Sequence, residues 1–297
     1  MKYAIVIPAK DEELTLENTL DSVLSQSFLP EICLVVDDGS TDSTADIVNR
    51  KMKENPIVNY IKIKGEKTYK LGGHVIEVFN AGKKHIESLG IEYDYIVKLD
   101  ADLVFENNVM KAFIPYMDKA YGIVSGTPYY MEEGKKIYDR SPAFHSRGQF
   151  KVYNKKCLDE IGGVPLGLGW DTADNVKAMQ KGWKTLRIDE IDYLMERKIG
   201  GKHNLKKGKI KHGIGAYNLR YSPLYLTMRI IHDLFKPPLV IGSLYYMYGY
   251  FKSLFSASER VLSKDEGKLL RKLFWSGFNN RFKSKDFYIL QKLSGKK

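Results

Sequence analysis

Two aspartates, Asp100 and Asp102, stand one residue apart at the end of the apolar stretch YIVKLDADLVF, residues 95–105. Carboxylates this close repel each other, so the pair must be solvated, protonated or neutralised by a cation. An Asp-x-Asp pair at a strand end can place its oxygens on one divalent cation, and a cation that also bridges a nucleotide diphosphate neutralises both the pair and the ligand. Taken alone, the same pattern more often marks a turn or a helix cap.

The stretch VVDDGSTDST, residues 35–44, runs from an apolar strand directly into Asp37 and Asp38, followed by a glycine and small hydroxyl residues. An acid at such a strand end can accept hydrogen bonds from a base or a ribose, as acids do in dinucleotide sites. A turn with a helix N-cap at Ser40 or Thr41 explains the same residues, and both interpretations can hold together.

The stretch IPAKDEE, residues 7–13, is a third element, in which a strand ends at Pro8 and a short acidic loop opens a helix. The backbone of this loop and the side chain of Glu13 could border a nucleoside. The alternative is that Asp11 caps the helix, with the acids favourably placed near the helix N-terminus.

The stretch GLGWDTADNVKAMQKGWKT, residues 167–185, places Asp171 after a glycine-rich turn and an indole, just before a helix. A carboxylate there can be the general base at an acceptor hydroxyl, and Asp174 can cap the helix or support the base. The alternative is that Asp171 only caps the helix. Between these stretches, His145 and Arg147 have positions that suggest the acceptor side.

The elements that must position these residues alternate along the first 125 residues. Apolar runs predict strands at residues 3–8, 31–37, 57–63, 94–100 and 121–126, and helical spacing predicts helices at 12–26, 41–54, 74–90 and 107–117. Such alternation predicts an open parallel sheet with right-handed crossovers. Ligands of these sheets bind beyond the carboxyl ends of the strands, so one edge should gather Asp37, Asp38, Asp100 and Asp102.

The composition is that of a globular chain with a divided charge. The 297 residues are 43% hydrophobic and 28% charged, enough for one large domain or a domain with an appendage. The formal charge is +11, and the residues from Tyr193 onward hold 22 Lys and Arg against 6 Asp and Glu. This basic third could attract nucleic acid, phosphorylated ligands or anionic lipid. Cys33 and Cys157 are expected to be buried, reduced thiols, and the apolar run before Pro8 is too short for a signal peptide.

The last third predicts a basic loop followed by helices. Residues 194–219 are rich in Gly, Lys and His and poorly periodic, which predicts a loop. Residues 237–251 carry no charge, but they are fewer than the roughly 20 that a bilayer span needs. A buried helix, an interfacial helix and a short span all stay open, and the tyrosines and flanking lysines favour the interface. The tail from Ser258 is basic and amphipathic.

In their order and spacing, VIPAKDEE, VVDDGSTD, KLDADLVF and GWDTADNVKAMQKGWKT resemble the family 2 glycosyltransferases of GT-A fold. KLGGHVIEVFNAG, residues 70–82, is similar to a segment between the family's second and third motifs. The resemblance covers about residues 1–195 and implies an α/β fold with a GT-A, Rossmann-like, mostly parallel sheet flanked by helices, which would be the catalytic domain. Composition adds the expectation of a basic, partly apolar helical C-terminal extension, with a basic flexible active-site loop at 196–221 and a helical, membrane-associating region at 222–297.

The resemblance implies a nucleoside site along the first two motifs. Its border would be Pro8, Ala9 and Glu13, with Ala9 and Glu13 the closest contacts. Asp37 or Asp38 would hydrogen-bond the base, and the resemblance does not decide between them.

The resemblance also implies a metal and diphosphate site. Asp100, Ala101 and Asp102 would bind the diphosphate of a nucleotide-sugar through a Mg²⁺ or Mn²⁺ ion, with Asp102 the more direct ligand. His203 is similar to a histidine that some members of the family place near the metal or diphosphate, and Lys202 could stabilise the diphosphate there. The two aspartates would tolerate each other because a cation and a diphosphate lie between them.

For catalysis, the resemblance makes Asp171 the base that deprotonates an acceptor hydroxyl, which attacks the anomeric carbon in line and inverts it. The preceding residue is Trp170 where the family has Glu, and its indole could stack on the acceptor sugar. The family's processive Gln-x-x-Arg-Trp element is absent. We therefore expect transfer of a single sugar to a glycan or lipid-linked acceptor in cell-surface polysaccharide or glycoconjugate synthesis.

The expected setting is the cytoplasmic face of the cell membrane, where the basic third would hold the enzyme to anionic lipid near its acceptor. A homo-oligomer is an open alternative. A sugar-phosphate nucleotidyltransferase also uses an α/β sheet and a metal, but it would need a glycine- and arginine-rich loop where this chain has PAKDEE. A non-enzymatic nucleic-acid binder would explain the basic third, but that third carries no recognisable binding motif for nucleic acid.

Overall fold

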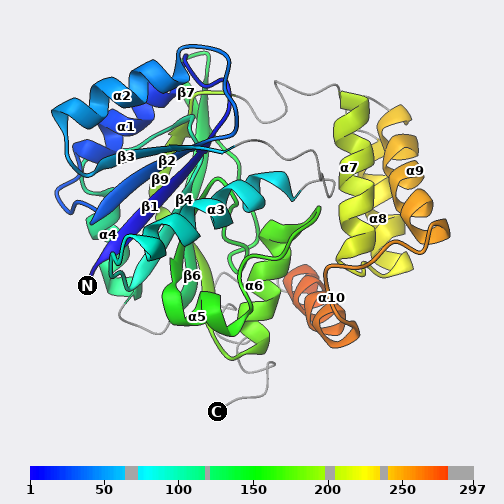
Figure 1. The fold of residues 1–297 in the computed structure, drawn as a ribbon. Coiled ribbons are helices and arrows are strands. Elements are labelled where there is room, and N and C mark those ends of the chain that lie inside the picture. Colours follow the sequence, from blue (N-terminus) through cyan, green and yellow to red (C-terminus); the bar gives the residue numbers. More distant parts are fainter. Residues whose placement is uncertain (64–72, 118–120, 198–204, 235–239, 280–297) are drawn as a thin grey trace. The chain divides into compact units, whose positions relative to one another are not determined.

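The computed structural model describes residues 1–63, 73–117, 121–197, 205–234 and 240–279 (Figure 1). The chain divides into two compact units. The sheet unit comprises Met1–Thr68, Val75–Gly163 and Trp183–Lys198, and the helical unit comprises Tyr69–His74, Val164–Gly182 and Ile199–Lys297.

One mixed sheet organises the sheet unit. Its strands lie in the order β3-β2-β1-β4-β8-β6-β9-β5, and β7 pairs with β6. The strand bounds are β1 (Tyr3–Ala9), β2 (Ile32–Asp37), β3 (Val58–Lys62), β4 (Tyr95–Leu99), β5 (Leu103–Val104), β6 (Tyr121–Glu132), β7 (Lys135–Tyr138), β8 (Phe150–Asn154) and β9 (Lys184–Met195). The first four strands by position, β3 to β4, run parallel as predicted. β8 lies antiparallel between β4 and β6.

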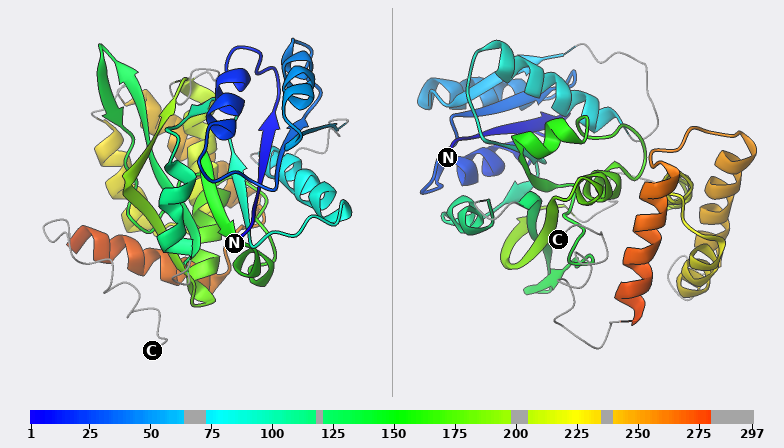
Figure 2. Two further views of the ribbon diagram at one scale, coloured as in Figure 1. Left: turned by 90° about the vertical axis from the view of Figure 1, so that its left-hand side faces the viewer. Right: turned by 90° about the horizontal axis from the view of Figure 1, so that it is seen from below.

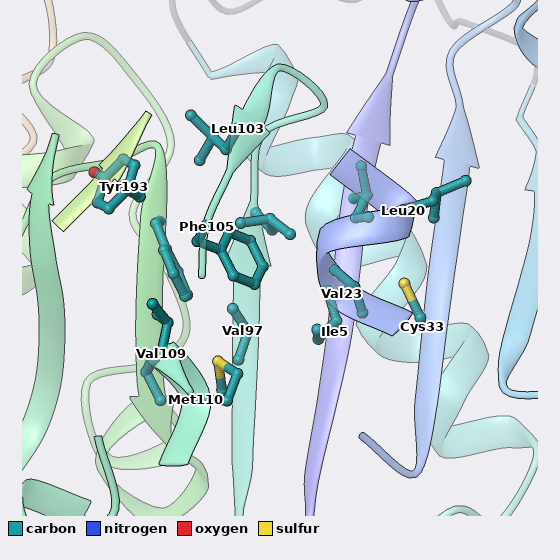
Figure 3. Close-up of a cluster of buried hydrophobic side chains, with 14 of the residues drawn as sticks. Ile5, Leu20, Val23, Cys33, Val97, Leu103, Phe105, Val109, Met110 and Tyr193 are labelled. Carbon is teal, nitrogen blue, oxygen red and sulfur yellow. The ribbon is translucent and has the colours of Figure 1, made fainter. Parts of the chain in front are cut away.

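Helices cover both faces of the parallel strands (Figure 1). α1 (Leu16–Leu24), α2 (Thr44–Glu54) and α4 (Val109–Met117) pack on one face and share a hydrophobic core with the strands. Figure 3 shows Leu20, Val23 and Met110 from these helices beside Ile5 and Val97 from the strands. Because both faces are covered, the strands are continuous apolar runs, which is the pattern that predicted them.

On the other face, α3 (His74–Ser88) packs directly on the strands through Gly82. A Cβ atom at this position would lie 2.6 Å from Cγ1 of Val6 and 2.8 Å from Cγ2 of Val36, so only glycine allows this spacing. A short helix, α5 (Lys155–Glu160), follows β8. The two cysteines, Cys33 and Cys157, are buried and free, as expected.

The helical unit contains α6 (Trp170–Gln180), α7 (Leu205–Asn218), α8 (Pro223–Leu234), α9 (Ile241–Phe255) and α10 (Lys264–Asn279). The segment 196–221 was expected to be a flexible loop, but it is helical over Leu205–Asn218. Residues 198–204 lie outside the described residues.

Close backbone contact at glycines explains why α7 lacks the apolar periodicity that usually marks a helix. A Cβ atom at Gly213 would lie 1.9 Å from the carbonyl oxygen of Tyr246, and one at Gly249 would lie 2.2 Å from the carbonyl oxygen of Ile210. The backbones of α7 and α9 therefore touch, and the two helices lie side by side (Figures 1 and 2). Contact between backbones leaves little trace in a pattern of apolar side chains, so the sequence of α7 resembles that of a loop.

The division between the units differs from the expected boundary at residue 195. Residues 164–182, with α6, belong to the helical unit. Nζ of Lys177 on α6 forms an ion pair with Oε1 of Glu266 on α10 at 3.0 Å, and Nδ2 of Asn218 donates to the carbonyl oxygen of Leu168 at 3.0 Å. These contacts come from residues far along the chain, so sequence spacing alone could not indicate them.

One side of α9 is buried and the other is exposed. Tyr246 and Tyr250 are buried, whereas Leu244, Tyr248 and Phe255 are 57%, 56% and 83% exposed. Residues 237–239 of the uncharged stretch lie outside the described residues. Across the helices that the structure describes, none combines the length and the apolar character that crossing a membrane requires.

Candidate functional site

The loops that follow β1 and β2 are bonded to each other at the carboxyl edge of the sheet. The backbone N of Asp11 donates to Oγ of Ser40 at 3.0 Å, and the backbone N of Thr41 donates to Oδ1 of Asp11 at 2.9 Å. Asp11 has a φ of 52°, which Asp tolerates better than most residues. These bonds explain why α1 and α2 begin later than their polar residues predict, because those residues join the two loops instead.

Glu13 belongs to the same arrangement. Its Oε2 accepts from the backbone N of Ser43 at 3.1 Å, and its own backbone N donates to Oδ2 of Asp42 at 3.1 Å. The Glu13 carboxylate therefore lies at the start of α2. Pro8 and Ala9, also expected at the nucleoside border, form the last residues of β1, where Ala9 is buried and pairs with Asp37.

Asp37 and Asp38 have different surroundings. Asp37 is buried; its Oδ1 accepts from the backbone N of Ser40 at 2.7 Å and its Oδ2 from the hydroxyl of Tyr60 at 2.6 Å. Burial raises the pKa of Asp37, but the hydrogen bonds and the charge of Lys62 outweigh it, and the pKa is lowered. Oδ2 of Asp38 lies 3.4 Å from Nζ of Lys10, on the loop after β1. Asp37 therefore stabilises the turn at Ser40, and Asp38 lies next to the loop after β1.

Asp100 is paired with a buried lysine. Nζ of Lys98, which is 2% exposed, donates to the carbonyl oxygen of Gly148 at 2.8 Å and forms an ion pair with Oδ1 of Asp100. Burial raises the pKa of Asp100, the carboxylates of Asp102 and Glu12 add to this, and Lys98 opposes it. The repulsion between Asp100 and Asp102 that the sequence predicts is therefore present, and Lys98, two residues earlier on β4, offsets part of it.

Asp102 is paired with an arginine that lies two residues beyond the end of β9. Nε of Arg197 lies 3.1 Å from Oδ2 of Asp102, and a second guanidinium nitrogen forms an ion pair with Oε2 of Glu12. The short β5–β9 pairing, which joins Leu103 to Met195, brings the arginine there. Ala101, between the two aspartates, is buried. Arg197 thus ties the loop after β1 to the Asp-x-Asp pair.

Sequence reasoning did not find Arg197, Lys98 or Glu12. Lys98 had a usable signal, since a lysine inside a buried strand needs a partner and Asp100 lies two residues away. Arg197 had none, because it is 95 residues from Asp102 in the chain.

The donor set fits a divalent cation of the Mg²⁺ or Mn²⁺ type. Two carboxylates on one strand end are the ligands that such ions take when substrate phosphates and waters complete the shell. Among the described residues, no group of three or more His, Cys, Asp and Glu side chains is arranged to hold a metal. Oδ2 of Asp102 contacts Arg197, so this oxygen would be open to a metal only once Arg197 has moved away. His203 and Lys202 lie outside the described residues.

The expected base and acceptor residues are in the helical unit. Trp170 and Asp171 open α6, after Gly169, which has a φ of 91°. The side chain of Asp171 is half-buried, and its carbonyl oxygen accepts from Nδ2 of Asn175 at 2.7 Å. Asp174 is fully buried and its Oδ1 accepts from the backbone N of Asn175 at 2.7 Å. The structure thus brings the expected donor residues together in one unit and carries Trp170 and Asp171 on the other.

Comparison with known proteins identifies the family of this chain. The family model described as Glycosyl transferase family 2 matches residues 4–167. Poly-beta-1,6-N-acetyl-D-glucosamine synthase of Staphylococcus epidermidis is 23% identical over 259 residues, 76% of this chain and 57% of that protein. The protein of the same name from Staphylococcus aureus (strain COL) is 28% identical over 252 residues, 74% of this chain and 55% of that protein. The chain thus spans little more than half the length of these relatives.

Solved structures share the fold. Mannosyltransferase PcManGT from Pyrobaculum calidifontis, in complex with GDP-Man and Mn²⁺, has a TM-score of 0.56 at 15% identity, over 99% of this chain and 84% of that one. TarS of S. aureus in complex with UDP-GlcNAc has a TM-score of 0.54 at 15% identity, over 99% and 79%. These likenesses confirm the expected GT-A type of α/β fold.

Proposed function

Because this chain belongs to glycosyl transferase family 2, we propose that it transfers one sugar from a nucleotide-sugar to a hydroxyl group of a glycan or lipid-linked acceptor. The observation that carries the proposal is the meeting of three acidic loops, after β1, β2 and β4, at the carboxyl ends of the parallel strands of the sheet. This edge is where open α/β sheets bind their ligands. The product would be a cell-surface polysaccharide or glycoconjugate; the curated relatives are named as synthases of poly-beta-1,6-N-acetyl-D-glucosamine.

The donor proposed is a UDP-sugar. TarS, which has this fold, is known in complex with UDP-GlcNAc, and the curated relatives are named for an N-acetylglucosamine polymer. Asp38 would accept hydrogen bonds from the base, and Asp37 would hold the turn in place, since its oxygens already serve Ser40 and Tyr60. Pro8 and Ala9 would border the nucleoside with their backbone.

A divalent cation would be held by Asp102, with Asp100 beside it. When bound, such an ion neutralises the charge that develops on the departing diphosphate. Arg197 would have to leave Asp102, and its guanidinium could then donate to the diphosphate oxygens, a geometry for which arginine is suited.

Asp171 would deprotonate the acceptor hydroxyl, which attacks the anomeric carbon from the face opposite the nucleotide, so that the configuration inverts. The half-buried position of Asp171 at the start of α6 supports this role, because the helix N-terminus favours its ionised form. Trp170 would stack on the acceptor sugar.

We further propose that α9 lies on an anionic membrane surface. Leu244, Tyr248 and Phe255 form an exposed apolar stripe on this helix, and the neighbouring α7 carries Lys206 and Lys207 on its exposed surface. An apolar face bordered by lysines is typical of interfacial helices. This would make the enzyme peripheral on the cytoplasmic face of the membrane, near a lipid-linked acceptor.

Vesicle sedimentation tests the membrane proposal. The protein should bind vesicles of phosphatidylcholine with phosphatidylglycerol, and Leu244→Glu should weaken this binding. Leu89→Glu is the matched control and should bind as the wild type does. Leu89 lies in the sheet unit and is 50% exposed, close to the 57% of Leu244. Equal binding by both variants would contradict the proposal.

The transferase proposal is tested by thermal unfolding with UDP-, GDP- and dTDP-sugars, each with and without Mn²⁺. A ligand that binds the folded state raises the melting temperature by mass action. We expect a metal-dependent rise with UDP-sugars, together with slow donor hydrolysis. A folded protein that responds to no nucleotide-sugar under any of these conditions would contradict the proposed function.

A further inference from the structure

Three buried polar atoms near Asp100 have no hydrogen-bond partner among the residues that the structure describes. They are Nε of Arg147, Oε1 of Gln149 and Oη of Tyr193. Buried polar groups in folded proteins almost always have a partner, so each of these atoms needs an explanation. Their positions give one.

Gln149 lies directly across from Asp100. Leu99 pairs with Phe150 at the end of the antiparallel β4–β8 ladder, and the backbone N of Asp100 donates to the carbonyl oxygen of Gln149 at 2.9 Å. Residues opposite each other in a ladder put their side chains on the same face. The carboxamide of Gln149 therefore borders the Asp-x-Asp pair, on the side away from β1 and β2.

Arg147 lies two residues before Gln149 in the chain and is held in place by three contacts. Its backbone N donates to Oγ of Ser125 at 3.0 Å, and one terminal guanidinium nitrogen donates to the carbonyl oxygen of Asp139 at 3.3 Å and forms an ion pair with its carboxylate. These contacts fix the guanidinium from β6 and the loop before β8. Its Nε–H is a buried donor without a hydrogen-bond partner among the described residues.

The hydroxyl of Tyr193 completes the group. Tyr193 is 1% exposed, and its ring packs edge-on against Phe150, with ring centroids 5.4 Å apart. Figure 3 shows its oxygen directed away from the apolar cluster. Tyr193 pairs with Pro128 of β6, and the carbonyl oxygen of Pro128 accepts from the backbone N of Asp139, the residue that holds the guanidinium of Arg147. Burial raises the pKa of Tyr193; the charges of Arg147 and Arg187 lower it and those of Asp100 and Asp139 raise it.

The order of the strands indicates what belongs here. In the proposed function, the nucleoside lies at β1 and β2 and the diphosphate at β4. The next strands along the sheet are β8, β6 and β9, and these are the strands that bring Gln149, Arg147 and Tyr193. The group attached to the diphosphate is the sugar to be transferred, so it falls beside these three residues.

The chemistry of the three atoms matches a sugar. Nε–H of Arg147 and the hydroxyl of Tyr193 can donate, and Oε1 of Gln149 can only accept. A sugar hydroxyl donates and accepts at once, and an acylamino substituent offers a carbonyl oxygen to the donors and an N–H to the acceptor. An apolar ligand or a bare phosphate would leave Gln149 without a donor.

We propose that Arg147, Gln149 and Tyr193 bind the transferred sugar of the donor through its hydroxyl or acylamino substituents. The proposal rests on the proposed function and adds to it the residues that distinguish a nucleotide-sugar from the free nucleotide. It predicts that these residues contribute to binding of the sugar and not to binding of the nucleotide.

The test compares UDP with UDP-GlcNAc on the full chain, with Mn²⁺ present, by calorimetry. In Tyr193→Phe and in Gln149→Leu, we expect UDP to bind as it does to the wild type and UDP-GlcNAc to bind roughly fivefold to tenfold more weakly, the effect of one lost hydrogen bond. Tyr193→Phe removes a single oxygen and leaves the packing against Phe150 intact. Circular dichroism confirms that each variant is folded.

Tyr95→Phe is the matched control. It also removes a buried tyrosine hydroxyl, one that donates to the carbonyl oxygen of Met117 at 2.6 Å, but at the opposite end of β4. It should leave the ratio of the two affinities at the wild-type value. If Tyr193→Phe and Gln149→Leu also keep that ratio, water satisfies the buried atoms, and the sugar proposal is overturned while the proposed function stands. If the folded wild type binds neither UDP nor UDP-GlcNAc, both are overturned for this donor class.

Discussion

The two units of this chain hold their residues in contrasting ways. In the sheet unit, Asp37, Asp100 and Asp102 are each fixed by hydrogen bonds or ion pairs to other residues of the unit. In the helical unit, α7 and α9 meet through their backbones at Gly213 and Gly249, and α9 keeps apolar side chains exposed. Fixed partners suit a small charged ligand, because little remains to be ordered when it binds. Under the proposed function, donor recognition would belong to the sheet unit and acceptor handling to the helical unit.

The most severe test of this contrast is Asp102→Ala in the sheet unit. Loss of the carboxylate that would hold a metal should remove several kcal/mol of transition-state stabilisation, so turnover should fall roughly 10³-fold. Release of UDP in the presence of acceptor measures it. Asp46→Ala, which removes an exposed aspartate from the first turn of α2, should turn over as the wild type does. Unchanged turnover in Asp102→Ala would break the assignment of the donor site.

The next largest effect is expected for Asp171→Asn, which tests whether catalysis and donor binding belong to different units. A general base contributes about 10²-fold or more, so turnover should fall by that factor. Donor binding, measured by the shift in melting temperature with UDP-sugar, should stay at the wild-type value. Asp265→Asn, a change at an exposed aspartate on α10, controls for loss of charge in the helical unit. Loss of donor binding in Asp171→Asn would show that the two functions are not divided between the units.

Two glycine substitutions on α7 test how the helical unit is held. Gly213→Ala puts a Cβ atom against the carbonyl oxygen of Tyr246, so it should destabilise the unit by about 1–3 kcal/mol. Gly208→Ala is the matched control, because its Cβ atom meets nothing within 4 Å, and it should stabilise the helix by up to about 1 kcal/mol. Thermal unfolding measures both. Equal melting temperatures would rule out the backbone contact.

The smallest effect concerns acid stability in the sheet unit. Burial raises the pKa of Asp37, but hydrogen bonds from Ser40 and Tyr60 and the charge of Lys62 lower it overall. A lowered folded pKa means that ionised Asp37 stabilises the fold above its unfolded pKa of about 4, and that this stability is lost as the pH falls through the folded pKa. The difference in melting temperature between wild type and Asp37→Asn should therefore shrink below about pH 4. A difference that stays constant with pH would contradict this.

The sequence predicted β1, β2 and β4 well because each of them is buried along almost its whole length and is therefore largely apolar. It predicted the starts of α1 and α2 less well. Asp11 and Glu13 have the composition of helix caps, but their side chains join the loops after β1 and β2. Local propensity cannot reveal that a polar side chain is used by another loop.

Long-range pairing explains the rest of what sequence could not provide. Arg197 reaches Asp102 only because β5 and β9 pair, and Tyr193 reaches the site through the same strand. α7 was missed because glycine lets backbones touch without an apolar stripe. In contrast, the acidic residues at the strand ends were predictable, since parallel topology alone gathers them at one edge.

The ion pairs of Lys98 and Arg197 have a consequence for how the protein matures in a cell. Both cations are supplied by the chain itself, so Asp100 and Asp102 are neutralised as soon as β4, β5 and β9 come together. Under the proposed function, synthesis and folding would then not wait for a metal supply, and a chelator should remove activity without unfolding the protein. Metal and nucleotide-sugar would displace Arg197 together, so that the availability of substrate, and not the assembly of the polypeptide, would set when the protein becomes active.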